Sequence, residues 1–251
     1  MALAPFLLAF PRIMTLGIRA CLADYSTDQR MALRRADRVL FPTQRFVHVL
    51  DAAGKATFPS VASYLVRRSR ILQCSLLAYH ELPMPRTRCY YGFRQKTQIV
   101  HDFKLPLMAY GPCVTPGSSR LISAPSELWP WVRAFNPVVV QEYVPLDQRV
   151  RFVCVNYRCL AVLQSSTDAD ENQSFLPVET RDPVFRQILE VTLRLLEASR
   201  IDDIALEWGY GRGQWWALGA LRSPAKMDGM NGRINRHEVV GRMITEGLWI
   251  G

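Results

Sequence analysis

Three short apolar segments in the middle of the chain restrict the possible folds more than any other part of it. They lie at 138–144, 151–155 and 158–163. Each is rich in valine and other residues that favour strands. Asn156 and Tyr157 separate the last two segments, and a two-residue break of this kind is typical of a β-hairpin. This region therefore predicts neighbouring antiparallel strands.

Helical and strand patterns follow one another along the rest of the chain. From apolar spacing, helices are predicted at 28–38, 46–53, 61–79, 125–135, 182–199 and 235–246. By the same reasoning, further strands are predicted at 15–22, 37–41, 88–91, 107–110, 203–208 and 214–218. Pro83 and Pro85 favour an extended connector at 82–87. The patterns together predict a mixed α and β fold.

The first 57 residues read as a small βαβ-like unit. They contain no glycine-rich phosphate loop, so they do not form a complete dinucleotide-binding domain. The first ten residues are apolar, but a basic region is lacking, and Pro5 and Pro11 interrupt the run. We interpret this stretch as a frayed extension, or as the result of a start codon placed upstream of Met14, rather than as a signal peptide.

Composition excludes several classes of protein. Apolar residues make up 49% and charged residues 21% of the 251 residues, which argues against disorder, collagen and coiled coil. No apolar run reaches the roughly 18 residues of a membrane span, so no membrane partner is expected. The six cysteines show neither a CxxC pair nor zinc-finger spacing. We interpret them as buried thiols of a cytoplasmic protein.

The charge of the chain favours an anionic partner. Thirty-one basic residues against 22 acidic ones leave a net charge of +9, which suits nucleotides, nucleic acid, acidic peptides or a membrane surface. Arginine supplies nearly all of this charge. The lysines are Lys55, Lys96, Lys104 and Lys226.

From about Phe58 to the C-terminus, the order of segments carries a family resemblance. The order is a helix, LPMPRT, a strand, a loop, a helix, VVVQEYVPLDQRVRFVCVNYRCLAVLQ, a long helix and IDDIALEWGYGRGQWWALGAL. In this order the chain resembles the ATP-grasp superfamily, and within it the RimK-type carboxylate–amine ligases. The resemblance implies an α+β (or α/β) fold with lid and core subdomains and an antiparallel core sheet. The implied division is a small βαβ-like domain at 1–57 and an ATP-grasp domain at 58–251, with the lid at about 86–140 and the core at about 141–251.

The resemblance also implies a set of site residues. It assigns nucleotide binding to Arg70, Gln141, Glu142, Tyr143 and Val144. The last four belong to the hinge that holds the adenine of ATP in this family. Arg151 is the candidate catalytic residue that points into the nucleotide site, and Glu207 is the candidate Mg²⁺ ligand.

Several positions depart from the family pattern. Arg70 stands where the family has its first phosphate-binding lysine, and it replaces a point charge with a planar fork. Tyr110 stands at the second lysine position. The Glu-x-Asn of the last core strand corresponds to 219–221, Gly-Ala-Leu, which cannot ligate a hard cation. The alternative ligands downstream are Asp228, Asn231 and Asn235. ATP is thus the expected ligand, whereas these losses weaken the expectation of Mg²⁺.

Three hypotheses follow from this pattern. The favoured one is a degenerate ATP-grasp protein that binds nucleotide weakly and does not form an acyl phosphate. The first alternative is an active, divergent ligase in which Arg70, Arg151 and Glu207 do the work. The second is a non-catalytic module that binds an acidic peptide or a protein partner through Arg67, Arg68, Arg70, Arg86, Arg88 and Arg94.

Nucleic acid ranks below these hypotheses. Arginines alternate with aromatic residues at 86–93, but that alternation also suits an ordinary half-exposed strand. The substrate and the oligomeric state stay open.

Overall fold

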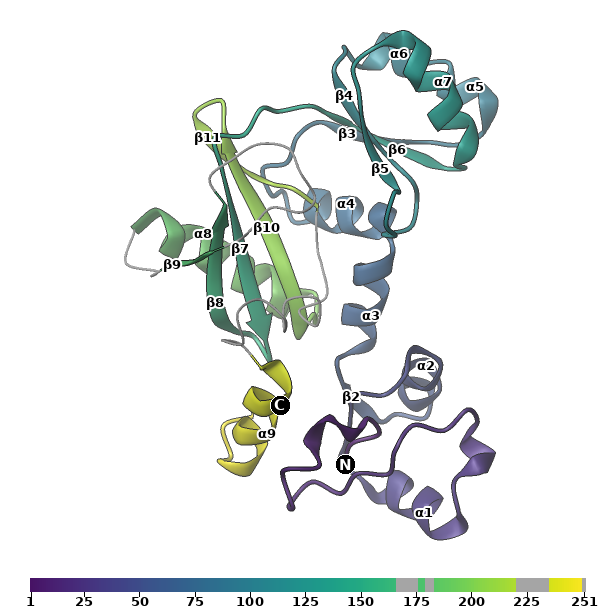
Figure 1. The fold of residues 1–251 in the computed structure, drawn as a ribbon, viewed down its shortest axis with the longest axis vertical. Coiled ribbons are helices and arrows are strands. Elements are labelled where there is room, and N and C mark those ends of the chain that lie inside the picture. The colour runs from purple at the N-terminus through teal and green to yellow at the C-terminus, as the bar shows by residue number, and fades with distance from the viewer. Residues whose placement is uncertain (166–175, 179–182, 220–234, 250–251) are drawn as a thin grey trace.

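The computed structural model describes residues 1–165, 176–178, 183–219 and 235–249. Its strands are β1 (Arg38–Leu40), β2 (Ala56–Phe58), β3 (Thr87–Tyr90), β4 (Leu107–Tyr110), β5 (Ser119–Ile122), β6 (Val138–Glu142), β7 (Gln148–Val155), β8 (Arg158–Ser165), β9 (Leu176–Val178), β10 (Asp203–Gly211) and β11 (Gln214–Ala217). Its α-helices are α1 (Thr27–Arg35), α2 (Gln44–Ala52), α3 (Val61–Arg68), α4 (Arg70–Tyr79), α5 (Gly92–Lys96), α6 (Ile99–Asp102), α7 (Pro125–Ala134), α8 (Pro183–Ala198) and α9 (Arg236–Thr245). Figure 1 shows their arrangement.

The N-terminal part is built on a two-stranded parallel sheet. β1 pairs with β2, and α1 and α2 precede these strands. The predicted strand at 15–22 is wrong, because only Thr15 makes a bridge there, to Ala2. The prediction of a frayed N-terminus is also wrong. Ala2, Leu3 and Leu7 are fully buried, because the first residues lie against β1 and against α9 from the other end of the chain (Figure 1).

The helix predicted at 61–79 is in fact two helices that meet at Ser69. Ser69 has an extended backbone, and its hydroxyl caps α4 by accepting from the backbone N–H of Leu72. A loop of the lid region occupies the break, since the N–H of Arg70 donates to Pro112 O and the N–H of Val114 donates to Arg68 O. The break thus ties the helix pair to the loop after β4.

The strands β3-β6-β4-β5 form an antiparallel sheet that we call the lid sheet. One of its faces packs under α5, α6 and α7 (Figure 1), and Leu107, Ala109, Val138 and Val140 contribute to that core. The opposite face carries Tyr110 and the neighbouring positions of β6. The strand β5 and the short helices α5 and α6 were not predicted.

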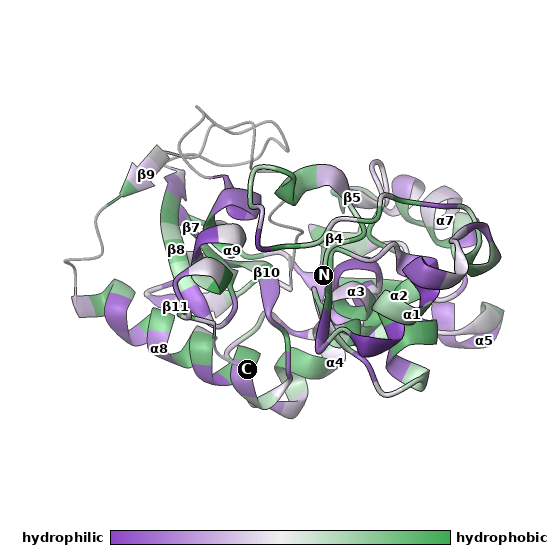
Figure 2. Ribbon diagram, turned by 90° about the horizontal axis from the view of Figure 1, so that it is seen from below, coloured by the Kyte–Doolittle hydropathy of each residue, from purple (hydrophilic) through white to green (hydrophobic). Residues whose placement is uncertain are grey.

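The strands β11-β10-β7-β8-β9 form a second antiparallel sheet, which we call the core sheet. Residues directly opposite in an antiparallel pair share a face. Val150, Phe152, Ile204 and Leu206 lie on the face that packs against α8. In Figure 2, α8 alternates between hydrophobic and hydrophilic bands, as expected of a helix with one face buried. The other face of the sheet carries the charged residues described below.

The α+β architecture with antiparallel sheets confirms the predicted fold class. The hairpin predicted around Asn156 and Tyr157 is present, and both residues have positive φ angles, of 49° and 61°. No helix in the described ranges is long and apolar enough to cross a membrane. The division into domains at 57 and 58 stays a prediction.

Candidate functional site

One face of the core sheet carries an ion-paired group of three residues. Arg151 on β7 lies opposite Glu207 on β10, and Arg149 follows two residues away on the same face of β7. A guanidinium nitrogen of Arg151 lies 3.1 Å from Glu207 Oε2, and one of Arg149 lies 3.9 Å from Oε1. Glu207 is 2% exposed and Arg151 9% exposed, so this pairing is buried. The strand register therefore brings together the predicted catalytic and metal-binding positions.

A second contact joins three positions that lie far apart in the sequence. Arg70, at the start of α4, is buried, and its guanidinium lies 4.6 Å from the centre of the Tyr110 ring. The same guanidinium donates to the carbonyl of Gly219. In the family pattern, Arg70 and Tyr110 stand at the two lysine positions, and Gly219 stands at the position of the glutamate in the Glu-x-Asn segment. The structure thus places all three together, but as a closed contact between a cation, a ring and a carbonyl.

Tyr110 connects the two groups. Burial raises the pKa of its phenol, while the charges of Arg70 and Arg149 lower that pKa and the charge of Glu207 raises it. These side chains are therefore close enough to act on one another, and we call Arg70, Tyr110, Arg149, Arg151 and Glu207 the arginine site. It lies where the lid sheet and the core sheet meet.

Cys74 lies at the edge of the arginine site, on α4. Burial raises the pKa of its thiol to about 11, although the charge of Arg70 opposes this. The thiol therefore stays protonated at neutral pH and is unsuited to act as a nucleophile. Only some of the cysteines fit the prediction of buried thiols. All six are free, but Cys21 and Cys113 are exposed.

The predicted adenine hinge is held by side-chain contacts at both ends. Gln141 is buried, and its amide receives a hydrogen bond from the Tyr110 hydroxyl at 3.1 Å and donates to Thr87 at 2.9 Å. Glu142 pairs with Arg212, which also donates to the carbonyl of Tyr143 at 3.2 Å. The carboxylate and one hinge carbonyl are thus already engaged.

The hinge continues across the end of β10, and two glycines allow this crossing. Val144 and Leu146 are buried there. A Cβ added to Gly209 would lie 2.7 Å from the Leu146 side chain, and one added to Gly211 would lie 2.2 Å from the carbonyl of Pro145. The hinge therefore requires glycine at 211, where a side chain would meet the backbone, whereas a side chain at 209 would displace that of Leu146. Gly209 and Gly211, in the last part of β10, thus also support the hinge.

The described residues do not fit a Mg²⁺ site. Glu207 is the only carboxylate of the arginine site, and both of its oxygens face guanidinium groups. Within the described ranges, no three histidine, cysteine, aspartate or glutamate residues gather where they could hold a metal. Of the alternative ligands, Asp228 and Asn231 lie outside the described residues. Asn235 caps α9 through its side chain.

The arginines do fit an anion. Arg149 is partly exposed, and its ion pair with Glu207 is at the long limit of such contacts. Its Nε is buried and has no hydrogen-bond acceptor within the described part of the chain. A buried donor of this kind costs free energy until an acceptor reaches it. Phosphate oxygens match guanidinium groups in charge and geometry.

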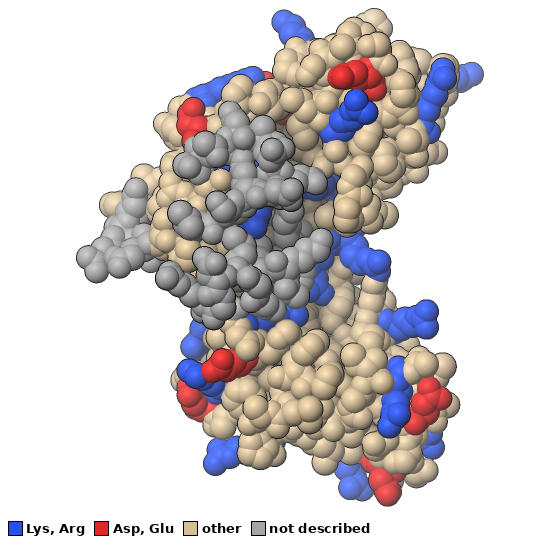
Figure 3. All heavy atoms as spheres, in the orientation of Figure 1, with Lys and Arg blue, Asp and Glu red and all other residues tan. Residues whose placement is uncertain are grey.

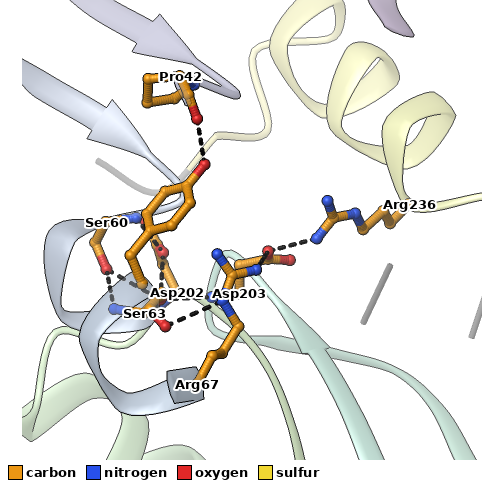
Figure 4. A network of polar contacts seen from close by, with 8 residues as sticks. Pro42, Ser60, Ser63, Arg67, Asp202, Asp203 and Arg236 are labelled. Atoms are coloured by element: carbon orange, nitrogen blue, oxygen red, sulfur yellow. Dashed lines mark hydrogen bonds and ion pairs between the residues drawn. The ribbon is translucent and has the colours of Figure 1, made fainter. Parts of the chain in front are cut away.

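A second buried charge centre lies at the start of β10, the strand that also carries Glu207 (Figure 4). Asp203, at the start of β10, is fully buried and pairs with Arg236 at 2.5 Å and with Arg67 at 3.4 Å. Its neighbour Asp202 accepts hydrogen bonds from Ser63 and from the N–H of Ser60. Burial raises the pKa of Asp202 to about 6. This centre joins α3, β10 and α9.

The six arginines proposed to bind an acidic partner do not all lie on the surface. Arg70 is 8% exposed, and the side chain of Arg67 is 12% exposed because it pairs with Asp203. The four that are exposed are Arg68, Arg86, Arg88 and Arg94. Figure 3 shows basic side chains spread over the visible face rather than gathered in one patch.

Sequence reasoning did not identify Arg149 as a site residue. The signal was available, since residues two apart in a strand share a face and Arg151 was already a candidate. The contact of Arg70 with Gly219 had no such signal, because these residues are 149 positions apart.

Comparison with known proteins supports this architecture. No protein-family model and no curated protein matches the sequence. A solved RimK domain protein of the ATP-grasp type from Sphaerobacter thermophilus DSM 20745 is similar in structure, with a TM-score of 0.70 and 16% identity over 98% of this chain and 94% of the other. A D-alanine–D-alanine ligase from Bacillus anthracis complexed with ATP gives 0.67 and 12% over 96% and 89%.

An N5-carboxyaminoimidazole ribonucleotide synthetase in its ADP complex is also similar, with a TM-score of 0.61 and 12% identity. The alignment covers 79% of this chain but only 57% of that enzyme. Identities this low establish the fold and not the activity. With its lid sheet, its core sheet and the arginine site where they meet, the chain has the ATP-grasp fold.

Proposed function

We propose that the chain binds ATP at the arginine site, holds the phosphates with guanidinium groups, and does not ligate a carboxylate to an amine. Arg149 carries the proposal, because its buried Nε has no acceptor among the residues that the structure describes and a phosphate oxygen would supply one. The hinge at 141–144 would hold the adenine. Two of the similar structures contain ATP or ADP, which supports a nucleotide as the ligand.

The charge balance of the arginine site supports a polyanion. The arginine site contains three guanidinium groups, those of Arg70, Arg149 and Arg151, and one carboxylate, that of Glu207, which pairs with Arg149 and Arg151. Two positive charges therefore remain in a partly buried place, where attraction to a phosphate is stronger than in water. Arginine keeps its charge at any physiological pH and can donate two hydrogen bonds to one phosphate.

The same residues argue against ligation. Formation of an acyl phosphate depends on charges placed where the transition state becomes more negative. Arg70 is held by Tyr110 and by the carbonyl of Gly219, so it would have to leave these partners to reach a phosphate. Within the described residues, no three histidine, cysteine, aspartate or glutamate side chains gather around Glu207 to hold a bridging metal ion. Impaired catalysis with weak nucleotide binding is therefore the favoured outcome.

Two alternatives are kept as competing proposals. An active, divergent ligase would use Arg70, Arg151 and Glu207, with metal ligands from outside the described residues. A binding module for an acidic peptide or protein would use the exposed arginines of α3 and the lid sheet. A cytoplasmic location stays a prediction.

Isothermal titration calorimetry with ATP, with and without Mg²⁺, tests the proposal. We expect ATP to bind equally well in both conditions, because arginines and not a metal ion hold the phosphates. Arg149→Ala should weaken binding about tenfold or more, the cost of one charge-assisted hydrogen bond. Arg158→Ala is the matched control, since it removes an equal charge from an exposed position of β8 at the other end of the sheet.

A phosphate-release assay separates the alternatives. We expect no Mg²⁺-dependent release of phosphate from ATP in the presence of mixed carboxylates and amines. Release that disappears in Glu207→Gln would establish the active ligase and overturn the catalytic part of the proposal. Absence of ATP binding to the unmodified protein would overturn the binding part.

A further inference from the structure

A pocket lies at the opposite end of the molecule from the lid sheet. It has a volume of about 780 Å³ and is bounded by residues of the N-terminal segment, α1, β1, α9 and the segment after α9. Figure 1 shows α1, the N-terminus and α9 together at that end. The pocket shares no residue with the arginine site. Its volume is within the usual range of sites for small molecules, about 300–1,000 Å³.

The lining combines a firm apolar floor with adaptable side chains. Ile13 and Leu40 are buried and belong to the packed core beneath. Met14 and Met31 are 57% and 40% exposed, which is high for such apolar side chains. The flexible methionine side chain adapts to irregular shapes and is common at surfaces that bind several different partners. The indole of Trp249 completes the apolar lining.

Charged groups accompany this apolar surface. The side chains of Arg12, Arg35 and Arg38 line the pocket together with those of Asp28 and Asp37, an excess of one positive charge. Met1 also lines the pocket, and its N-terminal ammonium adds to this excess when it is protonated. Through their side chains, Arg12 and Arg35 make neither a hydrogen bond nor an ion pair in the part of the chain that the structure describes.

Arg38 has a different role. Its guanidinium lies over the ring of Trp249 at 5.2 Å, an arrangement that orients both groups. The Nε1 of that indole is buried and has no acceptor within the described residues. The exposed guanidinium groups of Arg12 and Arg35 thus lie beside an apolar wall, where they are accessible to a ligand.

We propose that this pocket binds a small amphiphilic carboxylate, with the acid group at Arg12 and Arg35 and the apolar body against Met14, Met31 and Trp249. A carboxylate matches the fork of a guanidinium, and its negative charge is opposite to the net positive charge of the lining. A triphosphate or nucleic acid would place several negative charges near Asp28 and Asp37.

Binding of decanoate to the full-length protein tests the inference, by calorimetry or by ligand-observed NMR if binding is weak. We expect a dissociation constant of about 1 mM or lower, as suits a ligand of this size. Decylammonium, with the same apolar body and the opposite charge, should bind at least about tenfold more weakly. Decyl phosphate should also bind more weakly than decanoate, because its additional negative charge would lie near Asp28 and Asp37.

The double substitution Arg12→Ala/Arg35→Ala should weaken decanoate binding about tenfold or more. Arg34→Ala is a matched control, since Arg34 is an exposed neighbour on α1 that does not line the pocket. It should leave decanoate affinity unchanged, and saturating ATP should do the same. Melting curves establish that each variant folds.

Several results would overturn the inference. These are equal affinity of the unmodified protein and the double variant, equal or tighter binding of decylammonium or decyl phosphate, and no decanoate binding at concentrations up to about 10 mM. Because the pocket is separate from the arginine site, none of these results depends on whether ATP binds.

Discussion

Substitution of Asp203 by asparagine should cause the largest loss of stability among single polar substitutions in the described part of the chain. The carboxylate is fully buried, and its partners Arg236 and Arg67 have side chains that are 7% and 12% exposed. Asparagine preserves the shape of the side chain, so no cavity forms. The substitution therefore isolates the loss of one negative charge between two guanidinium groups (Figure 4).

The expected magnitude follows from the charges left behind. Removal of one partner from a buried ion pair costs about 3–5 kcal/mol, because the other charge stays buried without compensation. For a chain of this length, about 2–4 °C of melting temperature correspond to 1 kcal/mol, so Asp203→Asn should melt about 6–20 °C lower. Arg67→Gln should cost less, about 1–3 kcal/mol, because Asp203 keeps Arg236 at 2.5 Å.

Urea unfolding followed by circular dichroism, together with thermal melts, measures these losses. Asp51→Asn is the matched control, since Asp51 is exposed on α2 and has no ion pair within the described residues. Its effect should stay within about 0.5 kcal/mol. If Asp203→Asn loses no more than this control, the pairing contributes nothing net and our reasoning about the second charge centre is refuted.

Three further predictions concern the pH dependence of stability, the need for glycine at position 211 and the accessibility of the cysteine thiols. Burial raises the pKa of Asp202 in the folded protein to about 6, above its unfolded value near 3.9, so ionisation of this carboxyl destabilises the fold as pH rises through this window. The free energy of unfolding of Asp202→Asn, relative to that of the unmodified protein, should therefore grow by up to about 3 kcal/mol from pH 4 to 7. A difference in urea unfolding that stays constant over this pH range would contradict the prediction. Gly211→Ala should displace the carbonyl of Pro145, lower the free energy of unfolding by more than about 1 kcal/mol and weaken ATP binding. An unchanged melting temperature would show that a Cβ at this position does not clash with that carbonyl. Ellman's reagent should label Cys21 and Cys113 first in the native protein and reveal six thiols after unfolding; early labelling of the buried cysteines would contradict the structure.

Much of the fold was predictable because its signals are local. The strands at 138–163 and the long helix at 182–199 follow from apolar spacing, and each lies within a few residues of the observed element. The strand predicted at 15–22 failed because only Thr15 pairs there, with Ala2, which in turn pairs with Leu40 of β1. The prediction of one continuous helix at 61–79 failed at Ser69 for another reason. Both halves have helical spacing, and only the loop at 112–114 separates them.

The site was predictable to the extent that it lies on one sheet. The family resemblance assigned Arg151 and Glu207 to strands of the core sheet, and the observed register places them opposite each other on β7 and β10. The role of Arg149 follows from alternation along the same strand. The state of these side chains was not predictable, because burial and pairing depend on what packs over the sheet.

The sequence by itself determined most of the segments that form strands and helices, and which family positions lack the expected lysine, glutamate and asparagine. These properties depend on residues close together in the chain. Only the tertiary structure decided that Arg70 closes onto Tyr110 and Gly219, and that the two ends of the chain form a pocket. Both depend on groups that are neighbours in space and distant in sequence. The energy of a buried charge is set by those neighbours and not by its place in the chain.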